Sequence, residues 1–433
     1  MKPPALVAHG SLVALTALLL AAPAGAIVSD GARELREMRE TLIALQDRVD
    51  AQQRRIEAQD EVLREVGLED RGSGSRLSSF LQLTDFRGWV AASYFWNTND
   101  PRKPNAGGNG PFSNPFHADA NSFQFDEAWF VMDRPATREQ PAGFHVEIVF
   151  GATATAFSNV ENGTATAGNL DGNDLWIPSA NVSYRTPWGP TLTAGKFPTT
   201  IGYEVAGAPD NVNITRGFTY NLFQPISHTG VLASQRLDSG FGYALGVVNG
   251  FGTDQPNPND EVGALWQIGW ANDKAALHLN GFYTDDLAGD GRDRWLLDVV
   301  AEIAPTDDVF FWLNFDYMDT AQDGEHPWGV GVSLGGHLAL TDDLGVGGRV
   351  EYAHFDADGV ATFRDGNDVL RPLDGDLWSI TGTVDYALTR ALTGKVEAKY
   401  ETAGSGLGGS YREGRTHRSG DAVFLGSQLY YTF

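Results

Sequence analysis

Apolar and polar residues alternate along most of the chain from Phe86 to Phe433. The alternation is clearest in 144–150, 295–303 and 392–400, where one parity is mostly apolar and the other carries charged or amide residues. A period of two is typical of β-strands with one apolar and one polar face. The pattern predicts strands over 86–97, 122–132, 143–152, 178–186, 190–198, 227–237, 241–250, 262–271, 275–284, 293–304, 308–318, 327–340, 343–355, 377–387, 391–401 and 421–433.

The connections between these strands alternate between long and short. The long ones include 98–121, 153–177, 199–226, 356–376 and 402–420. The short ones include 186–190, 238–240, 272–274, 305–307 and 389–390. This alternation over an even number of strands is typical of outer-membrane β-barrels, which have short periplasmic turns and long outer loops. We therefore expect an all-β, antiparallel transmembrane β-barrel of about 16 strands over residues 81–433, with its apolar face toward lipid and its charged face toward a wet lumen.

The last predicted strand stops on an aromatic residue. Leu429, Tyr431 and Phe433 share its apolar parity. Such an end resembles the closing strand of bacterial outer-membrane barrels, which the barrel-assembly machinery recognises. The resemblance implies that this strand closes the sheet.

The start of the chain has the features of a secretory signal peptide over residues 1–26. Lys2 precedes an apolar run over 12–22, and the small residues 24–26 suit a cleavage site. The run is too short for a spanning helix, and no later stretch approaches the ~18 apolar residues that one needs. The chain is therefore expected to be exported, and a helical membrane protein is excluded.

Residues 27–70 are expected to form a short periplasmic coiled coil, joined by a polar linker over 71–80 to the barrel. Its apolar and glutamine residues recur at the first and fourth positions of a heptad without a slip, which favours a coiled coil over a single amphipathic helix. The seam residues are Leu35, Met38, Leu42, Leu45, Val49, Gln52, Ile56, Gln59 and Leu63.

Composition narrows the possible functions. The formal net charge of -25 argues against nucleic-acid partners, which need a basic surface. The absence of cysteine excludes disulfides and thiolate metal sites. Fifty-one glycines and many aromatic residues are consistent with tight turns and the aromatic girdles of barrels.

A series of motifs resembles the OmpL-like family of β-barrel porins. The stretch G-K-F-x-T-x-x-G-Y-E ends at Glu204, and an Asn/Arg loop with Asn211, Asn213 and Arg216 follows it. The motif P-x-x-H-T-G over 225–230 and V-V-N-G up to Gly250 complete the series. The resemblance implies an outer-membrane porin, and its specific part covers about 194–250.

The same segment contains the third outer loop, 199–226. In sixteen-stranded porins the third loop folds into the lumen and narrows it, so the loop count and the resemblance agree. An alternative is a loop that lies across the outer mouth. If the loop folds inward, the candidate residues of the pore constriction are Glu204, Asp210, Asn211, Asn213 and Arg216.

The polar parity of the strands predicts which charges face the lumen. The candidates are Glu147, Asp298, Glu302, Asp316, Arg349, Glu351, Lys395, Glu397 and Lys399, together with Asp126 and Asp385. Eight of these eleven side chains are carboxylates, and rings of carboxylates favour cations. A mild cation preference is the expectation.

The sequence offers no catalytic set and no metal site. Its nine histidines are scattered without the spacing of a zinc site. Aspartate-glycine clusters in the outer loops, such as 171–174 and 365–368, leave a weak possibility of Ca²⁺, but none completes a twelve-residue calcium loop. Turns that aspartate stabilises explain most of them. No cofactor and no enzymatic activity are expected.

The sequence therefore predicts a porin of the bacterial outer membrane, a homotrimer whose water-filled channels let small hydrophilic solutes or ions diffuse passively. Its other expected partners are lipopolysaccharide and the barrel-assembly machinery. The alternative is a structural barrel, tethered through its coiled coil to the cell wall or to a periplasmic partner. A plugged lumen would favour this alternative.

Overall fold

The computed structural model describes residues 83–100, 116–117, 121–161, 175–251, 262–285, 292–321, 324–356, 362–364, 370–372, 374–404, 411–413 and 417–433. The predicted signal peptide, the coiled coil with all of its seam residues, and the linker lie outside these residues.

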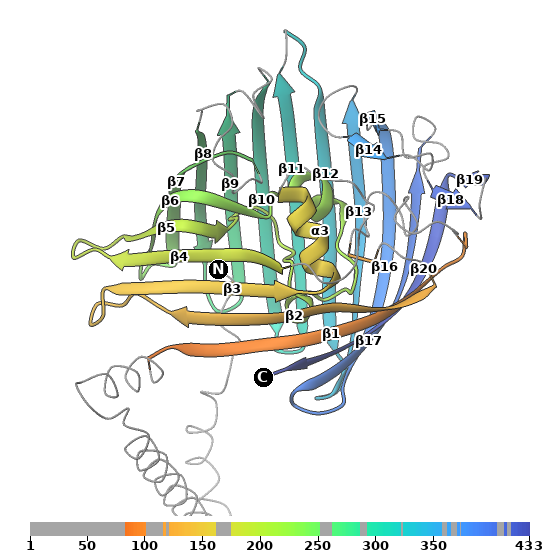
Figure 1. Ribbon diagram of the computed structural model, residues 1–433, viewed down its shortest axis with the longest axis horizontal. Coiled ribbons are helices and arrows are strands. Elements are labelled where there is room, and N and C mark those ends of the chain that lie inside the picture. Colours follow the sequence, from red (N-terminus) through yellow and green to blue (C-terminus); the bar gives the residue numbers. More distant parts are fainter. Residues whose placement is uncertain are drawn as a thin grey trace, which may run out of the picture. The chain divides into compact units, whose positions relative to one another are not determined.

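Sixteen antiparallel strands of the described chain form one closed barrel, as predicted (Figure 1). Each barrel strand pairs with the barrel strand that follows it along the chain, and β1 closes the sheet by pairing with β20. The strands are β1 Asp85–Asn97, β2 Ser122–Arg134, β3 Ala142–Phe150, β4 Leu175–Arg185, β5 Thr191–Pro198, β6 Ser227–Arg236, β7 Phe241–Val248, β8 Gly263–Ala271, β9 Ala275–Thr284, β10 Asp293–Thr306, β11 Val309–Ala321, β12 Trp328–Ala339, β13 Leu344–Asp356, β16 Gly375–Ala387, β17 Leu392–Ala403 and β20 Asp421–Thr432.

The short elements in the long connections were not predicted. The helix α3, Ala152–Glu161, follows Gly151, whose φ of 107° ends strand β3. Two small hairpins pair β14 Thr362–Arg364 with β15 Leu370–Pro372, and β18 Tyr411–Glu413 with β19 His417–Ser419. Among the described helices, none is long and apolar enough to cross a membrane.

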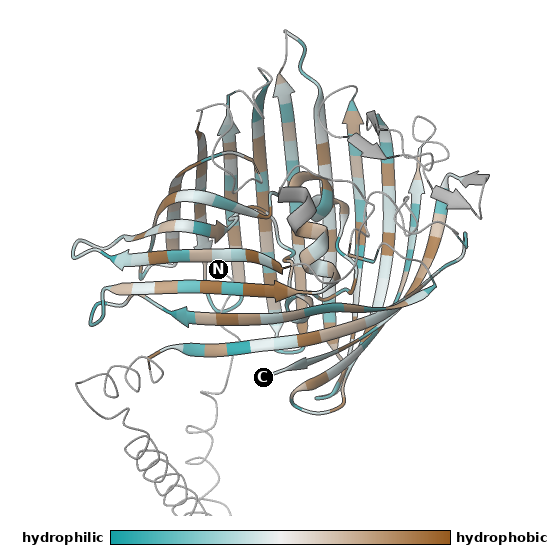
Figure 2. Cartoon of the chain, in the orientation of Figure 1, coloured by the Kyte–Doolittle hydropathy of each residue, from teal (hydrophilic) through white to brown (hydrophobic). Residues whose placement is uncertain are grey.

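The two faces of the strands differ in exposure, because only one of them is covered by protein. On β17, Val396 is 63 % exposed whereas the adjacent Glu397 is 2 % exposed. Figure 2 shows the alternation of hydrophobic and hydrophilic residues along the strands. The apolar parity forms the outer wall and the charged parity faces the interior, which is the arrangement of a transmembrane barrel.

The third connection, 199–226, packs inside the barrel. It contains two short helical turns, η1 Ala208–Asp210 and η2 Thr219–Phe223. Ile214, Phe218 and Phe223 are at most 1 % exposed and pack with apolar residues from the inner wall, such as Phe355. We call this segment the third loop. The barrel interior thus has an apolar core to which both the third loop and the inner wall contribute.

Candidate channel constriction

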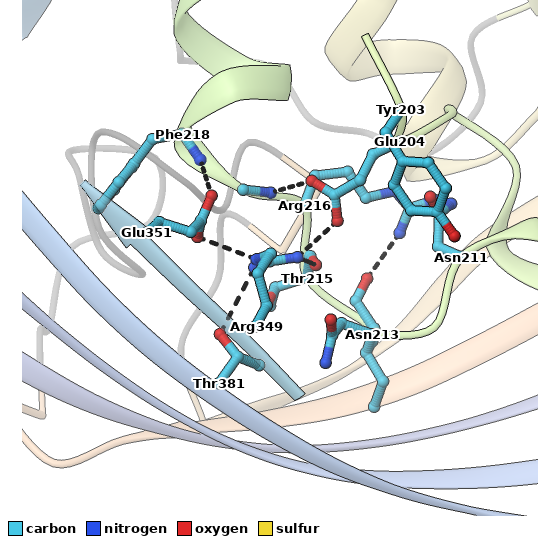
Figure 3. A network of polar contacts seen from close by, with 12 residues as sticks. Tyr203, Glu204, Asn211, Asn213, Thr215, Arg216, Phe218, Arg349, Glu351 and Thr381 are labelled. Carbon is cyan, nitrogen blue, oxygen red and sulfur yellow. Dashed lines mark hydrogen bonds and ion pairs between the residues drawn. The ribbon is translucent and has the colours of Figure 1, made fainter. Parts of the chain in front are cut away.

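Arg349 on β13 joins the third loop to the barrel wall (Figure 3). Its guanidinium lies 2.5 Å from a carboxylate oxygen of Glu204 in the loop and 2.9 Å from Glu351 on its own strand. It also donates a 2.8 Å hydrogen bond to the carbonyl of Thr215. All three charged side chains are buried. One cation therefore contacts two carboxylates and a loop carbonyl at the same point.

The loop backbone adds hydrogen bonds to both carboxylates. The Gly217 N–H donates to Glu204 at 2.6 Å, and the Phe218 N–H donates to Glu351 at 2.7 Å. Burial raises the pKa of Glu204 above its ordinary value, and the positive charge of Arg349 acts in the opposite direction. The ionised state of Glu204 therefore depends on Arg349.

Glu397 on β17 forms a second attachment. It accepts hydrogen bonds from the N–H groups of Ile214, at 2.6 Å, and Thr215, at 3.1 Å, and from the Thr215 hydroxyl at 2.6 Å. The Thr383 hydroxyl on β16 donates to the same carboxylate and accepts from Asn213. Several hydrogen bonds to one ionised group hold this part of the loop against two neighbouring strands.

Two lysines on β17 approach loop carbonyls. Lys395 donates to the Asn211 carbonyl at 2.5 Å, and Lys399 donates to the Arg216 carbonyl at 3.4 Å. Lys399 also forms a 2.6 Å ion pair with Glu401. The cations of this strand are therefore used in holding the loop and are not presented to water.

A carboxylate and an amide hold the first corner of the loop. Asp298 on β10 accepts hydrogen bonds from the Gly202 N–H and from Asn280, and Asn314 on β11 accepts one from the Tyr203 N–H. Asn314 in turn donates to Asp298 at 2.6 Å. Asp316, which pairs with Asp298 across the two strands, has an Oδ1 without a hydrogen-bond partner in the described chain.

These contacts predict opposite effects for two aspartate substitutions. In the described residues, no lysine or arginine pairs with Asp316, so Asp316→Asn removes a buried carboxyl group that lies beside Asp298 without a cation, and adds an N–H that can donate to Asp298. We expect its unfolding free energy to stay within about 1 kcal/mol of wild type or to rise. Asp298→Ala removes the acceptor of three hydrogen bonds, of whose donors only the Asn314 amide keeps another acceptor, and we expect it to lose about 3 kcal/mol. Urea unfolding in lipid vesicles tests both expectations. A larger loss of unfolding free energy in Asp316→Asn than in Asp298→Ala would contradict them.

The helix α3 and the first strands form a further attachment, which only β20 and β1 separate from β17 in the closed sheet. Phe157 of α3 stacks on Trp176 with ring centroids 4.3 Å apart and contacts Phe116 edge to face. The buried Glu127 on β2 accepts a 2.9 Å hydrogen bond from the loop N–H of Ala208 and a 2.6 Å bond from the Trp89 indole. The third loop is thus held by contacts at several places around the barrel wall.

His117, in the first outer connection, packs beside this region. The centroid of its ring lies 4.0 Å from the ring centroid of Phe95, and its Nε2 is 3.7 Å from Oδ1 of Asp126. Burial lowers the pKa of His117 to about 3, and the positive charge of Arg216 adds to the effect. The folded barrel therefore holds this imidazole in its neutral form.

The lowered pKa predicts a pH-dependent stability. In the unfolded chain His117 binds a proton near its usual pKa of 6.5, whereas in the folded chain it binds one only near 3. The unfolded state therefore binds more protons than the folded state below pH 6.5. As the pH is lowered, the free energy of unfolding decreases by up to about 1.4 kcal/mol per pH unit. His117→Gln should flatten the curve between pH 6.5 and 5, where ordinary carboxylates stay ionised. Parallel curves for variant and wild type, measured by urea unfolding, would show that the protonation of His117 does not cause the pH dependence of stability.

The five candidate constriction residues are placed differently from one another. Asp210 is exposed, whereas Glu204, Asn211, Asn213 and Arg216 are at most 4 % exposed. Arg216 donates to the carbonyls of three loop residues, Val205, Ala206 and Ile214. This differs from the expected eyelet, because a guanidinium that binds carbonyls of its own loop is not presented to passing solutes. These four side chains hold the loop in its shape.

The nine charges predicted to face the lumen all lie on the inner parity, and most of them contact the loop or its attachments. Those that are at most 5 % exposed are Asp298, Asp316, Arg349, Glu351, Lys395, Glu397 and Lys399. Glu147 and Glu302 keep partial exposure, as does Asp385, whose side chain is 24 % exposed. The water-accessible charge of the interior is therefore carried by fewer groups than strand parity implies.

Sequence reasoning missed Glu127 and Trp89 as partners of the loop. The register of β1 and β2 shifts between Ala91 and Ala92, so that Asp126 and Glu127 are both buried although they are adjacent. A β-bulge of this kind breaks the period of two. The signal in the sequence was the pair of successive acidic residues inside an otherwise aromatic strand.

A closed antiparallel barrel with an apolar outer wall, charged inner parity and third loop bound inside belongs to the porin class of outer-membrane β-barrels. The chain is a member of the family described as "Putative beta-barrel porin-2, OmpL-like", which matches residues 84–433. The resemblance seen in the motifs is thereby confirmed. A comparison with curated proteins found no match.

Solved structures share the fold at low sequence identity. The outer membrane channel DcaP of Acinetobacter baumannii is 13 % identical with a TM-score of 0.56, and the match covers 81 % of this chain and 97 % of DcaP. OmpT of Vibrio cholerae, in its trimer form, is 14 % identical with a TM-score of 0.53, covering 81 % and 99 %. OprB of Pseudomonas putida is 10 % identical with a TM-score of 0.52, covering 84 % and 97 %.

Proposed function

We propose that this chain forms a water-filled channel in the bacterial outer membrane, through which small hydrophilic solutes or ions diffuse passively. The observation that carries the proposal is the third loop, which is bound inside the closed barrel to β2, β10, β13 and β17, at four places around the wall. A loop held in this way sets a fixed width for the passage. The OmpL-like family membership supports the same function.

The charges that retain water contact support a mild preference for cations. His145 hydrogen-bonds both Asp133, at 2.8 Å, and Glu147, at 2.7 Å, so at most one positive charge faces two carboxylates. Asp210 at the loop is exposed and Asp385 partly so. The buried cations, by contrast, are bound to loop carbonyls and carboxylates. The water-accessible interior is therefore negative, which favours cation entry.

Single-channel recording in a planar bilayer tests the function. Under a KCl gradient, we expect stepwise openings and a reversal potential whose sign corresponds to preferential passage of K⁺ over Cl⁻. The double variant Glu147→Gln/Asp385→Asn should move that potential toward zero, because it removes two of the accessible carboxylates. Asp342→Asn is the control, since it removes an exposed charge in the short turn between β12 and β13. An anion-selective wild type, or an equal shift in the control, contradicts the proposed selectivity.

We further infer a homotrimer, with lipopolysaccharide around its rim and the barrel-assembly machinery as its folding partner. The trimer form of OmpT supports the oligomeric state. Openings in groups of three in the same recording, and a trimer mass in native mass spectrometry, are the expected results. A monomer mass with single-step openings contradicts the trimer.

The structural alternative rests on the burial of the third loop. Of its residues, only Asp210 is exposed, which is also what a plugged barrel would show. Folded, heat-modifiable barrels that never conduct would favour a barrel tethered through the segment 27–70. Conduction by the same preparation would favour the channel.

A further inference from the structure

Three aromatic rings lie together on the inner wall of the barrel, where the third loop begins. Tyr203 of the loop stacks on Trp312 of β11, with ring centroids 4.6 Å apart and 17° between the ring planes. The ring centroid of Phe310, on the same strand, lies 6.2 Å from that of Trp312 and 6.0 Å from that of Tyr203. The three rings therefore form one aromatic surface, which we call the ring cluster.

The surrounding structure holds the ring cluster in place. The Tyr203 N–H donates a 3.0 Å hydrogen bond to Asn314, and the N–H of the preceding residue donates a 3.1 Å bond to Asp298. Trp312 lies against Gly335 on β12, where an added Cβ would collide with the indole. The rings therefore need no rearrangement before a ligand can bind to them.

Two of the three rings can be reached from the lumen. Trp312 is only 2 % exposed, whereas Tyr203 and Phe310 keep partial exposure. Successive residues of β11 point to opposite faces of the sheet, and Phe311 is 47 % exposed on the lipid-facing side. The exposed part of Phe310 therefore faces the interior of the barrel, as does the third loop that carries Tyr203.

The surroundings of the ring cluster are negatively charged. Glu302 on β10 lies directly across from Trp312 and keeps partial exposure, and Asp210 of the third loop is exposed. Burial raises the pKa of the Tyr203 hydroxyl, and the negative charges of Glu302 and Asp210 add to this effect. The strands β11 and β12 contain no lysine or arginine. The electrostatic field at the rings therefore favours a cation.

Aromatic rings beside a carboxylate are suited to organic cations. The face of an aromatic ring is the negative end of its quadrupole, and it attracts a cation that lies within about 6 Å of the ring centroid. A quaternary ammonium group has no N–H that needs a hydrogen-bond acceptor. Ring faces and a nearby carboxylate are therefore sufficient to bind it after it has left water.

We propose that the ring cluster binds a small organic cation with a quaternary ammonium group, which lies over the rings of Tyr203 and Phe310 beside Glu302. The inference rests on the proposed function, because a solute reaches these rings through the water-filled lumen. It adds a class of solute to that function. Small inorganic cations, which keep their hydration water, pass the rings without this contact.

Nuclear magnetic resonance of the folded full chain in detergent micelles tests the site without requiring conduction. Tetramethylammonium is the probe, and saturation transfer from the protein to its methyl protons, corrected for empty micelles, reports binding. We expect tetramethylammonium to bind at least about fivefold more tightly than tert-butanol, which has a similar size and no charge. Phe310→Leu should weaken this binding by about fivefold, because leucine keeps the apolar contact but has no ring face.

The chain offers a matched control for each substitution. Phe311→Leu makes the same change one residue away, on the lipid-facing side, and should bind the probe as wild type does. Tyr203→Phe keeps the ring and should retain binding, whereas Tyr203→Leu should resemble Phe310→Leu. Glu302→Gln should also weaken binding, and its control is Asp308→Asn, which removes an exposed charge from the turn between β10 and β11. Heat-modifiability confirms that each variant is folded.

Three outcomes overturn the proposal. The first is equal binding of tetramethylammonium and tert-butanol, which means that the rings form an apolar surface only. The second is unchanged affinity in Phe310→Leu, and the third is an equal loss in Phe311→Leu. Single-channel recording separates this inference from the proposed function. A conducting barrel that does not bind the probe contradicts only the site, whereas a silent barrel that binds it with the expected variant effects contradicts only the channel.

Discussion

Arg349→Met is expected to release the third loop from the barrel wall. The substitution leaves Glu204 and Glu351 buried side by side without the cation that now bridges them at 2.5 and 2.9 Å. Removing one partner of a buried ion pair typically costs about 3–5 kcal/mol. We expect a loss of this size in urea unfolding, together with larger and noisier single-channel conductance because the loop no longer narrows the lumen.

Arg87→Met is the matched control for this experiment. Arg87 also pairs with a carboxylate, that of Asp85, at 2.9 Å, but both side chains are more than half exposed. Surface pairs of this kind contribute about 0–1 kcal/mol. Wild-type conductance in Arg349→Met would mean that the remaining attachments, through Glu397 and Asp298, are sufficient to hold the loop.

The second large effect is expected from Gly217→Ala, the addition of one methyl group. A Cβ at Gly217 would lie 1.9 Å from Oε1 of Glu351 and 3.0 Å from Oε2 of Glu204. The backbone of Gly217 is not in the left-handed region, so alanine meets no conformational strain and the effect is steric. Overpacking typically costs roughly 1–3 kcal/mol, and here it also pushes both carboxylates away from Arg349.

Gly382→Ala supplies the control. Gly382 lies on β16, and a Cβ there would have no atom within 4 Å. We expect Gly382→Ala to unfold at the wild-type urea concentration and to conduct normally, whereas Gly217→Ala should resemble Arg349→Met in both measurements. Equal behaviour of the two glycine variants would show that the carboxylates around Gly217 have room to move.

The strands could be predicted from sequence because a membrane barrel imposes the same period on every one of them. Helix α3 could not be, since its start, Ala152 to Ala156, alternates alanine and threonine and so continues the pattern of β3. Glu127 was missed for a related reason, because the bulge beside it reverses the parity of one residue.

The candidate site was predicted in position but not in detail. Strand parity placed Glu397 and Arg349 on the inner face, yet a period of two does not report what covers a side chain. Arg216 was expected to face the passage, whereas its guanidinium binds the carbonyls of Val205, Ala206 and Ile214. Loop conformation depends on contacts between distant parts of the chain, and a single sequence does not contain their pairing.

The distance along the chain between these partners has a consequence for the order of assembly. Glu204 lies 145 residues before Arg349, and Ile214 lies 183 residues before Glu397. The N–H groups of Ile214, Thr215 and Phe218 thus have no acceptors until β13 and β17 are in place, and contacts of such long range form slowly. Since β17 pairs with β20, the strand that closes on β1, the loop takes its final position only as the barrel closes. We therefore expect the third loop to reach its final position late in folding, together with the closure of the sheet.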